Sequence, residues 1–400
     1  MTNVTLEVVG GVDTHADTHH AAVVDTAGRQ LADRQFPTTE AGYVALIGFL
    51  VSFGTLLRVG VEGTGSYGAG LARALRAHHI HVAEVIRPNR QLRRIRGKSD
   101  PIDAYAAARA ALAEPDLPVP KVADGQVEAI RQLLVARRSA VKARTAAQVQ
   151  IKTLLVTAPT PVRAKYRTLT DTALISALSR TRSSEDTTTD ATLRALRSLA
   201  RRHQYLTGEI ADLDQTLEQL VTATNPALAA TKGIGPVTAG QLLVTAGDNP
   251  ERLRSEAAFA ALCGVSPIPA SSGKTTRHRL NRGGDRHANA ALHHIALSRM
   301  SYEPRTRDYV AKKRGDGKTT KEALRCLKRA IAREIFTLLT SNVDVPRIDD
   351  LRPLRQARGI SIETAAHHFG VWPMKISTIE RGKRRDDDFT HTYRQWLLTT

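Results

Sequence analysis

Leu6-Glu7-Val8-Val9-Gly10-Gly11-Val12-Asp13 is an apolar stretch that ends in a carboxylate, and Leu57-Arg58-Val59-Gly60-Val61-Glu62 repeats that arrangement. Short apolar runs rich in valine are typical of buried strands. A third stretch, Gly97-Lys98-Ser99-Asp100-Pro101-Ile102-Asp103, stands where an alanine-rich helix is expected to begin. We therefore expect carboxylates at two strand ends and one helix start, which can meet at one point in an α/β domain.

The four carboxylates Asp13, Glu62, Asp100 and Asp103 would repel one another if they converged, unless positive charge lay between them. Nucleases and phosphoryl-transfer enzymes usually balance such negative charge with a pair of Mg²⁺ ions roughly 3.5–4 Å apart. The alternative is that each acid separately caps a helix or a turn, and an acid before proline at a helix start is a common cap. We predict a site for two Mg²⁺ ions.

Composition indicates a polyanionic partner. The chain has 400 residues, enough for several domains, and a formal net charge of +19, for which nucleic acid is the first candidate and a membrane surface the second. The first residues do not resemble a signal peptide, and no apolar run is long enough to cross a bilayer. Its two cysteines suggest neither a disulfide framework nor a zinc cluster, so we expect a cytoplasmic protein without a membrane partner.

Residues 1–120 are expected to form the first domain. Strands are predicted at 6–12, 20–26, 29–36, 57–62 and 80–86, with helices after Thr38, after Gly65 and from Asp100. Three strands, a helix, a strand, a helix and a strand is the order of the ribonuclease-H-like fold, and the domain resembles a RuvC-type nuclease domain. In that fold the acids lie on the first strand, the fourth strand and a late helix.

Two further features lie near the acids. The segment from residue 87 to residue 96 is strongly basic, and it is either a solvated face or, as we expect beside a phosphodiester site, a phosphate-binding segment. The candidate residues are Arg93, Arg94 and Arg96 of this segment and Lys98 just after it. His15, His19 and His20 are expected to be structural, because their spacing suits strand alternation better than a zinc site.

The middle region, residues 121–223, shows apolar residues at roughly heptad spacing in two long segments. We predict a helical hairpin or coiled coil, formed within one chain or in a dimer. Both a plain spacer and a device for oligomerisation remain open.

Residues 224–345 hold two glycine-bearing candidates. The turn Gly233-Ile234-Gly235 looks like a helix-hairpin-helix element, whose backbone N–H groups would bind a DNA phosphate, or it is an ordinary helical turn. Ser272, before Gly273, is followed by many cations and suits attack on a phosphodiester, although a flexible turn is the alternative. The neighbouring cations are Lys274, Arg277, Arg279, Arg282 and Arg286.

These motifs together resemble the DEDD transposases of the insertion-sequence-110 family, which are related to the Piv-type DNA invertases. The shared order is Asp-Thr-His, Glu-Gly-Thr-Gly-Ser-Tyr, Lys-Ser-Asp-x-x-Asp-Ala, a coiled coil, Gly-Ile-Gly, and Ser-Gly before Gly-Gly-Asp-Arg. The resemblance implies that Ser272 is the nucleophile, that acids and serine come from different subunits, and that DNA becomes linked to the serine. It also implies an element-encoded guide RNA that pairs with target and donor DNA.

The tail, residues 346–400, departs from that pattern and resembles a Cro/repressor-type helix-turn-helix, with its recognition helix from about Trp372 to Glu380. It is either a DNA-binding module or one kept for protein contacts. The residues expected to reach bases or phosphates are Lys375, Ser377, Thr378, Arg381 and Lys383.

We therefore expect an α/β first domain followed by helical domains, in a Mg²⁺-dependent transposase or site-specific recombinase. It would act on double-stranded DNA at element ends and target as a homo-oligomer, a dimer or a tetramer. The alternatives are a RuvC-like structure-specific nuclease, in which water attacks, and a non-enzymatic DNA-binding regulator acting through the tail.

Overall fold

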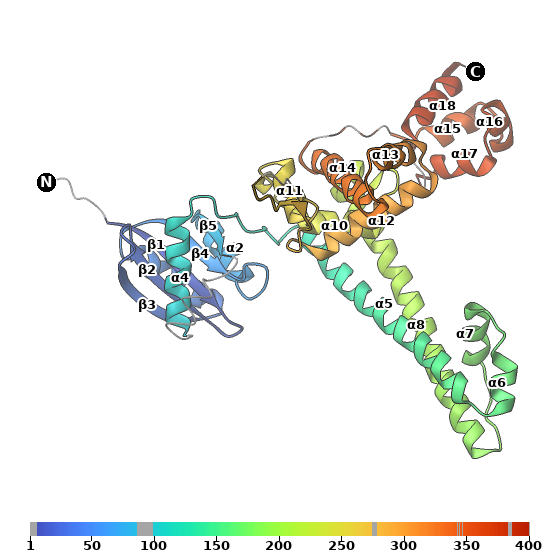
Figure 1. Cartoon of the computed structure of the whole chain (residues 1–400), viewed down its shortest axis with the longest axis horizontal. Helices are drawn as coiled ribbons and strands as arrows, with labels where there is room; N and C mark the ends of the chain where they lie inside the picture. The colour runs from blue at the N-terminus through green and yellow to red at the C-terminus, as the bar shows by residue number, and fades with distance from the viewer. Residues whose placement is uncertain are drawn as a thin grey trace. The chain divides into compact units, whose positions relative to one another are not determined.

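The computed structural model of the 400-residue chain describes residues 6–85, 99–273, 278–341, 343, 345, 347–382 and 386–399. The described chain divides into two compact units (Figure 1). The first unit comprises Met1–Gly125 and Ala246–Arg252, and the second comprises Gln126–Thr245 and Leu253–Thr400.

The described strands of the first unit form one five-stranded mixed sheet, in the order β3-β2-β1-β4-β5. Strand β1 pairs antiparallel with β2 and parallel with β4, and β4 pairs parallel with β5. The strands are β1 Glu7–Thr14, β2 Thr18–Asp25, β3 Gln30–Pro37, β4 Thr55–Glu62 and β5 Val82–Val85. The expected α/β first domain is thus confirmed, and its sheet is compatible with a ribonuclease-H-like domain.

Helices cover both faces of this sheet. Helices α1 (Glu40–Val51) and α2 (Ala69–Ala77) pack on one face, which buries Val8 and Val12, and α4 (Asp100–Ala113) packs on the other, which buries Val9. Gly11 allows α4 to lie close, because a Cβ atom there would lie 2.1 Å from the Ala108 nitrogen. Because side chains alternate along β1, Val8 and Val12 lie in one apolar core and Val9 lies in the other.

A long antiparallel helix pair begins the second unit. Helix α5 (Gln126–Thr157) packs along α8 (Thr187–Thr224), with Arg137 paired to Asp214 near one end and Ile151 in one core with Leu196 near the other. The predicted hairpin is present within a single chain, while pairing with a second chain stays a prediction. Helices α6 (Thr160–Tyr166) and α7 (Asp171–Ser179) were not expected, because such short helices show little periodicity.

The rest of the second unit is mostly helical, with a short hairpin of β6 (Ile268–Pro269) and β7 (His278–Arg279). Buried Phe259, Leu292 and Ile335 contribute to its core. The helices are α9 Pro226–Ala229, α10 Pro236–Ala246, α11 Glu256–Leu262, α12 Arg286–Tyr302, α13 Pro304–Gly315 and α14 Thr320–Thr340.

The segment Ala246–Arg252, which contains the 3₁₀ turn η1 (Pro250–Arg252), belongs to the first unit although the expected domain 224–345 included it. The Asn249 side chain explains this, since it donates to the Pro120 carbonyl at 3.1 Å and accepts from the Val122 N–H at 3.2 Å.

The C-terminal helices are α15 (Leu351–Ala357), α16 (Ile362–His368), α17 (Pro373–Glu380) and α18 (Asp387–Thr399), and they share their own apolar core. Within it Arg355 donates twice to the Glu380 carboxylate, at 2.6 and 2.9 Å. Helix α17 lies where the recognition helix was expected, from about Trp372 to Glu380, whereas the DNA-binding role remains a prediction. None of the described helices is long and apolar enough to cross a membrane.

Candidate active site

Strand register brings the first two acids together. Val12 of β1 lies beside Val61 of the parallel strand β4, so the following residues, Asp13 and Glu62, end neighbouring strands at the same sheet edge. Alternation places both side chains on the face that α4 covers. Asp13 is buried, with 7% of its surface exposed, and Glu62 is half-buried.

Helix α4 begins against this edge. Ser99 occupies the N-cap position, so Asp100 is the first helical residue and the separate-cap alternative for Asp100 is wrong. Asp100 is half-buried and Asp103 is 2% exposed, and both precede the buried alanines on the sheet-facing side of the helix. Acids in the first turn also interact favourably with the helix dipole.

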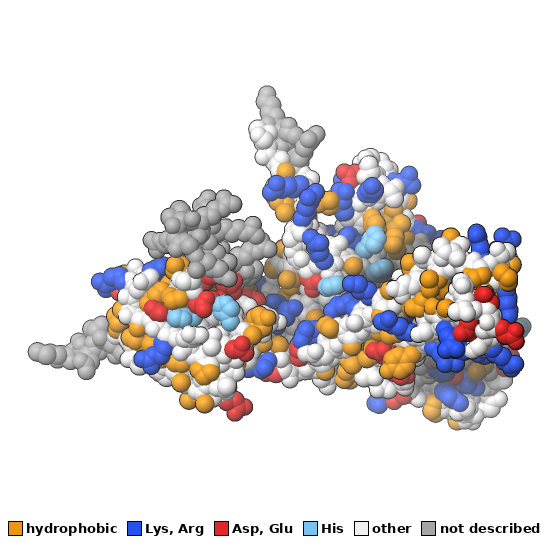
Figure 2. Space-filling model, turned by 90° about the horizontal axis from the view of Figure 1, so that it is seen from below, with side chains coloured by type: hydrophobic (Ala, Val, Ile, Leu, Met, Phe, Trp, Pro, Cys, Tyr) orange, Lys and Arg blue, Asp and Glu red, His pale blue; other side chains and the backbone are white. Residues whose placement is uncertain are grey.

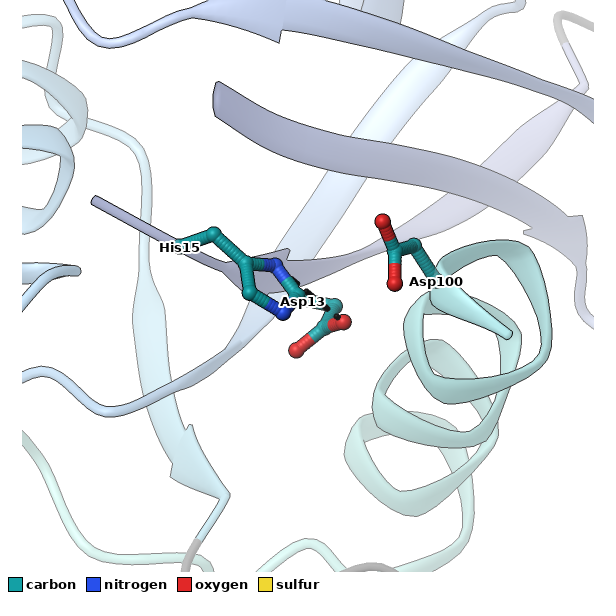
Figure 3. Close-up of side chains that lie close together, drawn as sticks. All are labelled: Asp13, His15 and Asp100. Carbon is teal, nitrogen blue, oxygen red and sulfur yellow. Dashed lines mark ion pairs between the residues drawn. The ribbon is translucent and has the colours of Figure 1, made fainter. Parts of the chain in front are cut away.

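A group of possible metal ligands lies at this point (Figure 3). One ligand atom each of Asp13, His15 and Asp100 lie within 4.8 Å of one another, and His15 Nδ1 is 3.7 Å from Asp13 Oδ2. Among the described residues this group comprises these three, with Glu62 and Asp103 outside it. Two carboxylates and an imidazole suit a divalent cation, although imidazole fits manganese or zinc better than magnesium.

His15 is the residue that the sequence interpretation missed. It lies just beyond the end of β1, two positions after Asp13, and this spacing on an extended chain places both side chains on one side. The other two histidines differ. His19 is buried and stacked on Tyr43, and burial lowers its pKa, while His20 contacts Asp33 at 2.7 Å.

The serine segment belongs to the second unit. Ser272 is exposed between β6 and β7, and the following Gly273 has a φ of +53°, a left-handed conformation that favours glycine. Arg279, Arg282 and Arg286 are also exposed. The sequence candidates that lie outside the described residues are Arg93, Arg94, Arg96, Lys98, Lys274, Arg277 and Lys383.

The turn Gly233-Ile234-Gly235 is held by contacts within the protein. Gly233 has a φ of +79°, and a Cβ atom there would lie 2.7 Å from Arg299 Cγ. The Gly235 N–H donates to the Thr238 hydroxyl at 3.0 Å, so a phosphate would have to displace that contact. Binding of DNA by this turn stays a prediction.

Polar residues of helix α17 make contacts within the C-terminal helices. Lys375 Nζ pairs with Asp386 at 3.1 Å and lies 4.0 Å from the centre of the Phe389 ring. Ser377 and Thr378 are half-buried, and Arg381 donates to the Ser377 carbonyl at 3.0 Å. The sequence interpretation gave no contact role to Trp372 and Met374, which are 82% and 66% exposed at the start of this helix.

Comparisons with known proteins place this chain in a family. A family model of the DEDD type, described as transposase, matches residues 10–158, which include all four acids. This match indicates the class of the protein, the transposases. A second model, described as the transposase IS116/IS110/IS902 family, matches residues 225–311, and the two models together cover more than half of the chain. The chain belongs to the IS110 family of transposases.

One relative is an uncharacterized 43.6 kDa protein of the insertion element IS110 from Streptomyces coelicolor. It is 34% identical over 116 residues, which are 29% of this chain. The chain spans only 28% of the length of that relative.

Proposed function

We propose that this protein cleaves and rejoins DNA strands as the transposase of an insertion sequence. The observation that carries the proposal is the convergence of Asp13, His15 and Asp100 at one sheet edge, in a chain that belongs to a transposase family. A charge of +19 supports a role on double-stranded DNA at the element ends and the target.

Asp13, Glu62, Asp100 and Asp103 are the proposed metal ligands, with a pair of Mg²⁺ ions as the proposed cofactor. Bound metal would neutralise the scissile phosphate and stabilise the charge that develops on it. The protein's own part is to hold the acids in place before substrate arrives. The register of β1 on β4 and the close packing of α4 on Gly11 do this.

Ser272 is the proposed nucleophile. Its Oγ–P bond would form as a P–O bond of the strand breaks, the hydroxyl losing its proton and the departing strand oxygen taking one up. The serine ester keeps the energy of the phosphodiester, so rejoining needs no external energy source. Arg279, Arg282 and Arg286 would neutralise the DNA nearby.

The family resemblance supports three further proposals. Acids and serine would come from different copies, so the active form would be a homo-oligomer, a dimer or a tetramer. A structured RNA encoded by the element would select the DNA. The protein would work in the cytoplasm.

The test is a denaturing gel of end-labelled DNA, run with and without protease digestion. Wild type should yield a protein-linked strand, and Ser272→Ala should yield neither this adduct nor recombinants. Ser271→Ala is the matched control, since it removes a neighbouring hydroxyl, and it should keep most activity. Free DNA ends without an adduct in wild type, undiminished in Ser272→Ala, would instead mean that water attacks.

A further inference from the structure

The second unit contains a cavity of about 940 Å³, between the loop 264–267, the β6–β7 hairpin and helices α12, α13 and α14. Its size is within the range of ligand pockets, roughly 300–1,000 Å³, but such pockets are mostly apolar. This one is lined by nine lysines and arginines, and Glu322 is the one acid among its described lining residues. Lysine and arginine side chains are also spread over the face of this unit seen in Figure 2.

The walls of the cavity are held by close backbone packing. Gly264 has a φ of +65°, and a Cβ atom there would lie 2.7 Å from the Gly283 carbonyl oxygen. The Asn289 amide donates to the carbonyls of Cys263 and Gly264, at 3.0 Å each. The loop is therefore fixed against α12 rather than free to fill the cavity.

Lys328 of α14 is a half-buried cation in this wall. Its Nζ donates to Asn289 Oδ1 at 2.8 Å, a neutral partner. Burial, with a smaller contribution from Arg325, lowers the pKa of Lys328. Within the part of the chain that the structure describes, no acid forms an ion pair with Lys328. An anion in the cavity would therefore relieve a charge that the fold leaves uncompensated.

Two arginines that line the cavity differ from Lys328, because they pair with an acid. Arg333 pairs with Glu256 at 3.2 Å, and Arg329 pairs with the same carboxylate. The lining thus combines neutralised arginines with cations that are available to a ligand. A small anion needs only two or three donors, whereas cations from a hairpin and several helices suit a longer polyanion.

We propose that this cavity binds the phosphodiester backbone of a nucleic-acid strand, with Arg325 and Lys328 of α14 as phosphate contacts. The proposal rests on the proposed function for the presence of nucleic acid, and adds a binding site on α14 that the motifs of the sequence did not indicate. The same lining includes Arg279 of β7, the strand that follows Ser272 in the chain, so a strand held here would continue toward the serine segment.

Binding is measured by fluorescence anisotropy with one sequence prepared as single-stranded DNA, single-stranded RNA and duplex DNA, over a range of salt. Lys328→Gln and Arg325→Gln should each weaken binding roughly five- to tenfold. Each should also lower the slope of log affinity against log salt by about 0.7–0.9. Lys321→Gln is the control, because Lys321 is an exposed residue of α14 outside the lining, and it should change affinity less than about twofold. The form bound most tightly identifies DNA or RNA as the source of the strand.

Equal losses in Lys328→Gln and Lys321→Gln would overturn the proposal. A measurement on wild type avoids any effect of substitution on folding: acylation of lysines, quantified by mass spectrometry, should be slowed by the oligonucleotide at Lys328 more than at Lys321. Equal protection would also overturn it. DNA cleavage is scored separately, so a wild type that cleaves DNA while Lys328→Gln binds normally refutes only the cavity. A chain that binds through Lys328 but forms no adduct or recombinant refutes only the proposed function.

Discussion

Asp13 at the end of β1 and Asp100 at the first position of α4 hold carboxylate oxygens within 4.8 Å of each other, although they are far apart in sequence. Two carboxylates at this separation repel when both are ionised, and burial of Asp13 strengthens the effect. A cation bound between them would relieve this repulsion and so stabilise the fold.

Removing one of these carboxylate charges should abolish activity without lowering the stability of the fold. We expect Asp13→Asn to abolish DNA cleavage while its melting temperature without metal equals or exceeds that of wild type, because the repulsion is relieved. Added Mg²⁺ should raise the melting temperature of wild type but not of the variant. Calorimetry with and without Mg²⁺, beside a cleavage assay, makes the measurement. Recombination by Asp13→Asn at the wild-type rate would refute the site.

His15 should influence the choice of metal. An imidazole near two carboxylates favours manganese relative to magnesium, so wild type should be at least as active with Mn²⁺ as with Mg²⁺. His15→Asn should lower the ratio of the Mn²⁺ rate to the Mg²⁺ rate. His20→Asn is the control, because His20 contacts Asp33 instead, and it should leave the ratio unchanged. An unchanged ratio in His15→Asn would show that His15 is not a ligand.

Close packing of α4 should be sensitive to one methyl group. A Cβ atom at Gly11 would lie 2.1 Å from the Ala108 nitrogen, so Gly11→Ala must displace α4. We expect it to lower the free energy of unfolding by about 1–3 kcal/mol and to reduce cleavage, since Asp100 moves with the helix. Gly48→Ala in α1 meets open space and should instead stabilise by roughly 0.5–1 kcal/mol. Urea unfolding compares the two, and equal effects would contradict the packing.

Acid should weaken the turn between β2 and β3. The Asp25 carboxylate accepts from the Arg29 N–H at 2.9 Å, from the Ala27 N–H at 3.0 Å and from Arg29 Nε at 2.6 Å. The Arg29 backbone bond contributes most to lowering the pKa of Asp25, against the opposing effect of burial. The stabilisation is therefore complete above the ordinary aspartate pKa of about 3.9 and disappears as the pH falls through the lowered value.

The variant Asp25→Asn tests the direction of this dependence of stability on pH. The variant should melt at a lower temperature than wild type at neutral pH, and the difference should shrink in acid. A difference that stays constant with pH would mean that the charge of Asp25 does not stabilise the turn.

Removing residues 346–400 should leave the chemistry intact, because neither the acids nor Ser272 lie there. The C-terminal helices have their own apolar core, so the rest of the second unit loses few packing partners. Cleavage of a preassembled substrate should persist, while binding to a short duplex weakens. Loss of cleavage on that substrate would place the tail in the catalytic core.

Sequence alone predicted the features that depend on neighbours along the chain. Valine-rich runs indicated β1 and β4, heptad spacing indicated α5 and α8, and their order indicated an α/β domain followed by helices. The same runs placed Asp13 and Glu62 at strand ends, because each carboxylate directly follows the last apolar residue of its run. The roles of Asp13, Glu62 and Ser272 stay predictions, and the experiments above test them.

Only the tertiary structure decided which side chains meet. Strand register sets Asp13 beside Glu62, and the crossing of α4 over Gly11 brings Asp100 toward His15, a residue that its local pattern marked as structural. Long-range packing likewise turned Lys375 toward Asp386 and gathered Arg279 and Lys328 around one cavity. Such contacts depend on the docking of separate elements, which local periodicity does not encode, because it reports which face of an element is apolar but not what covers it.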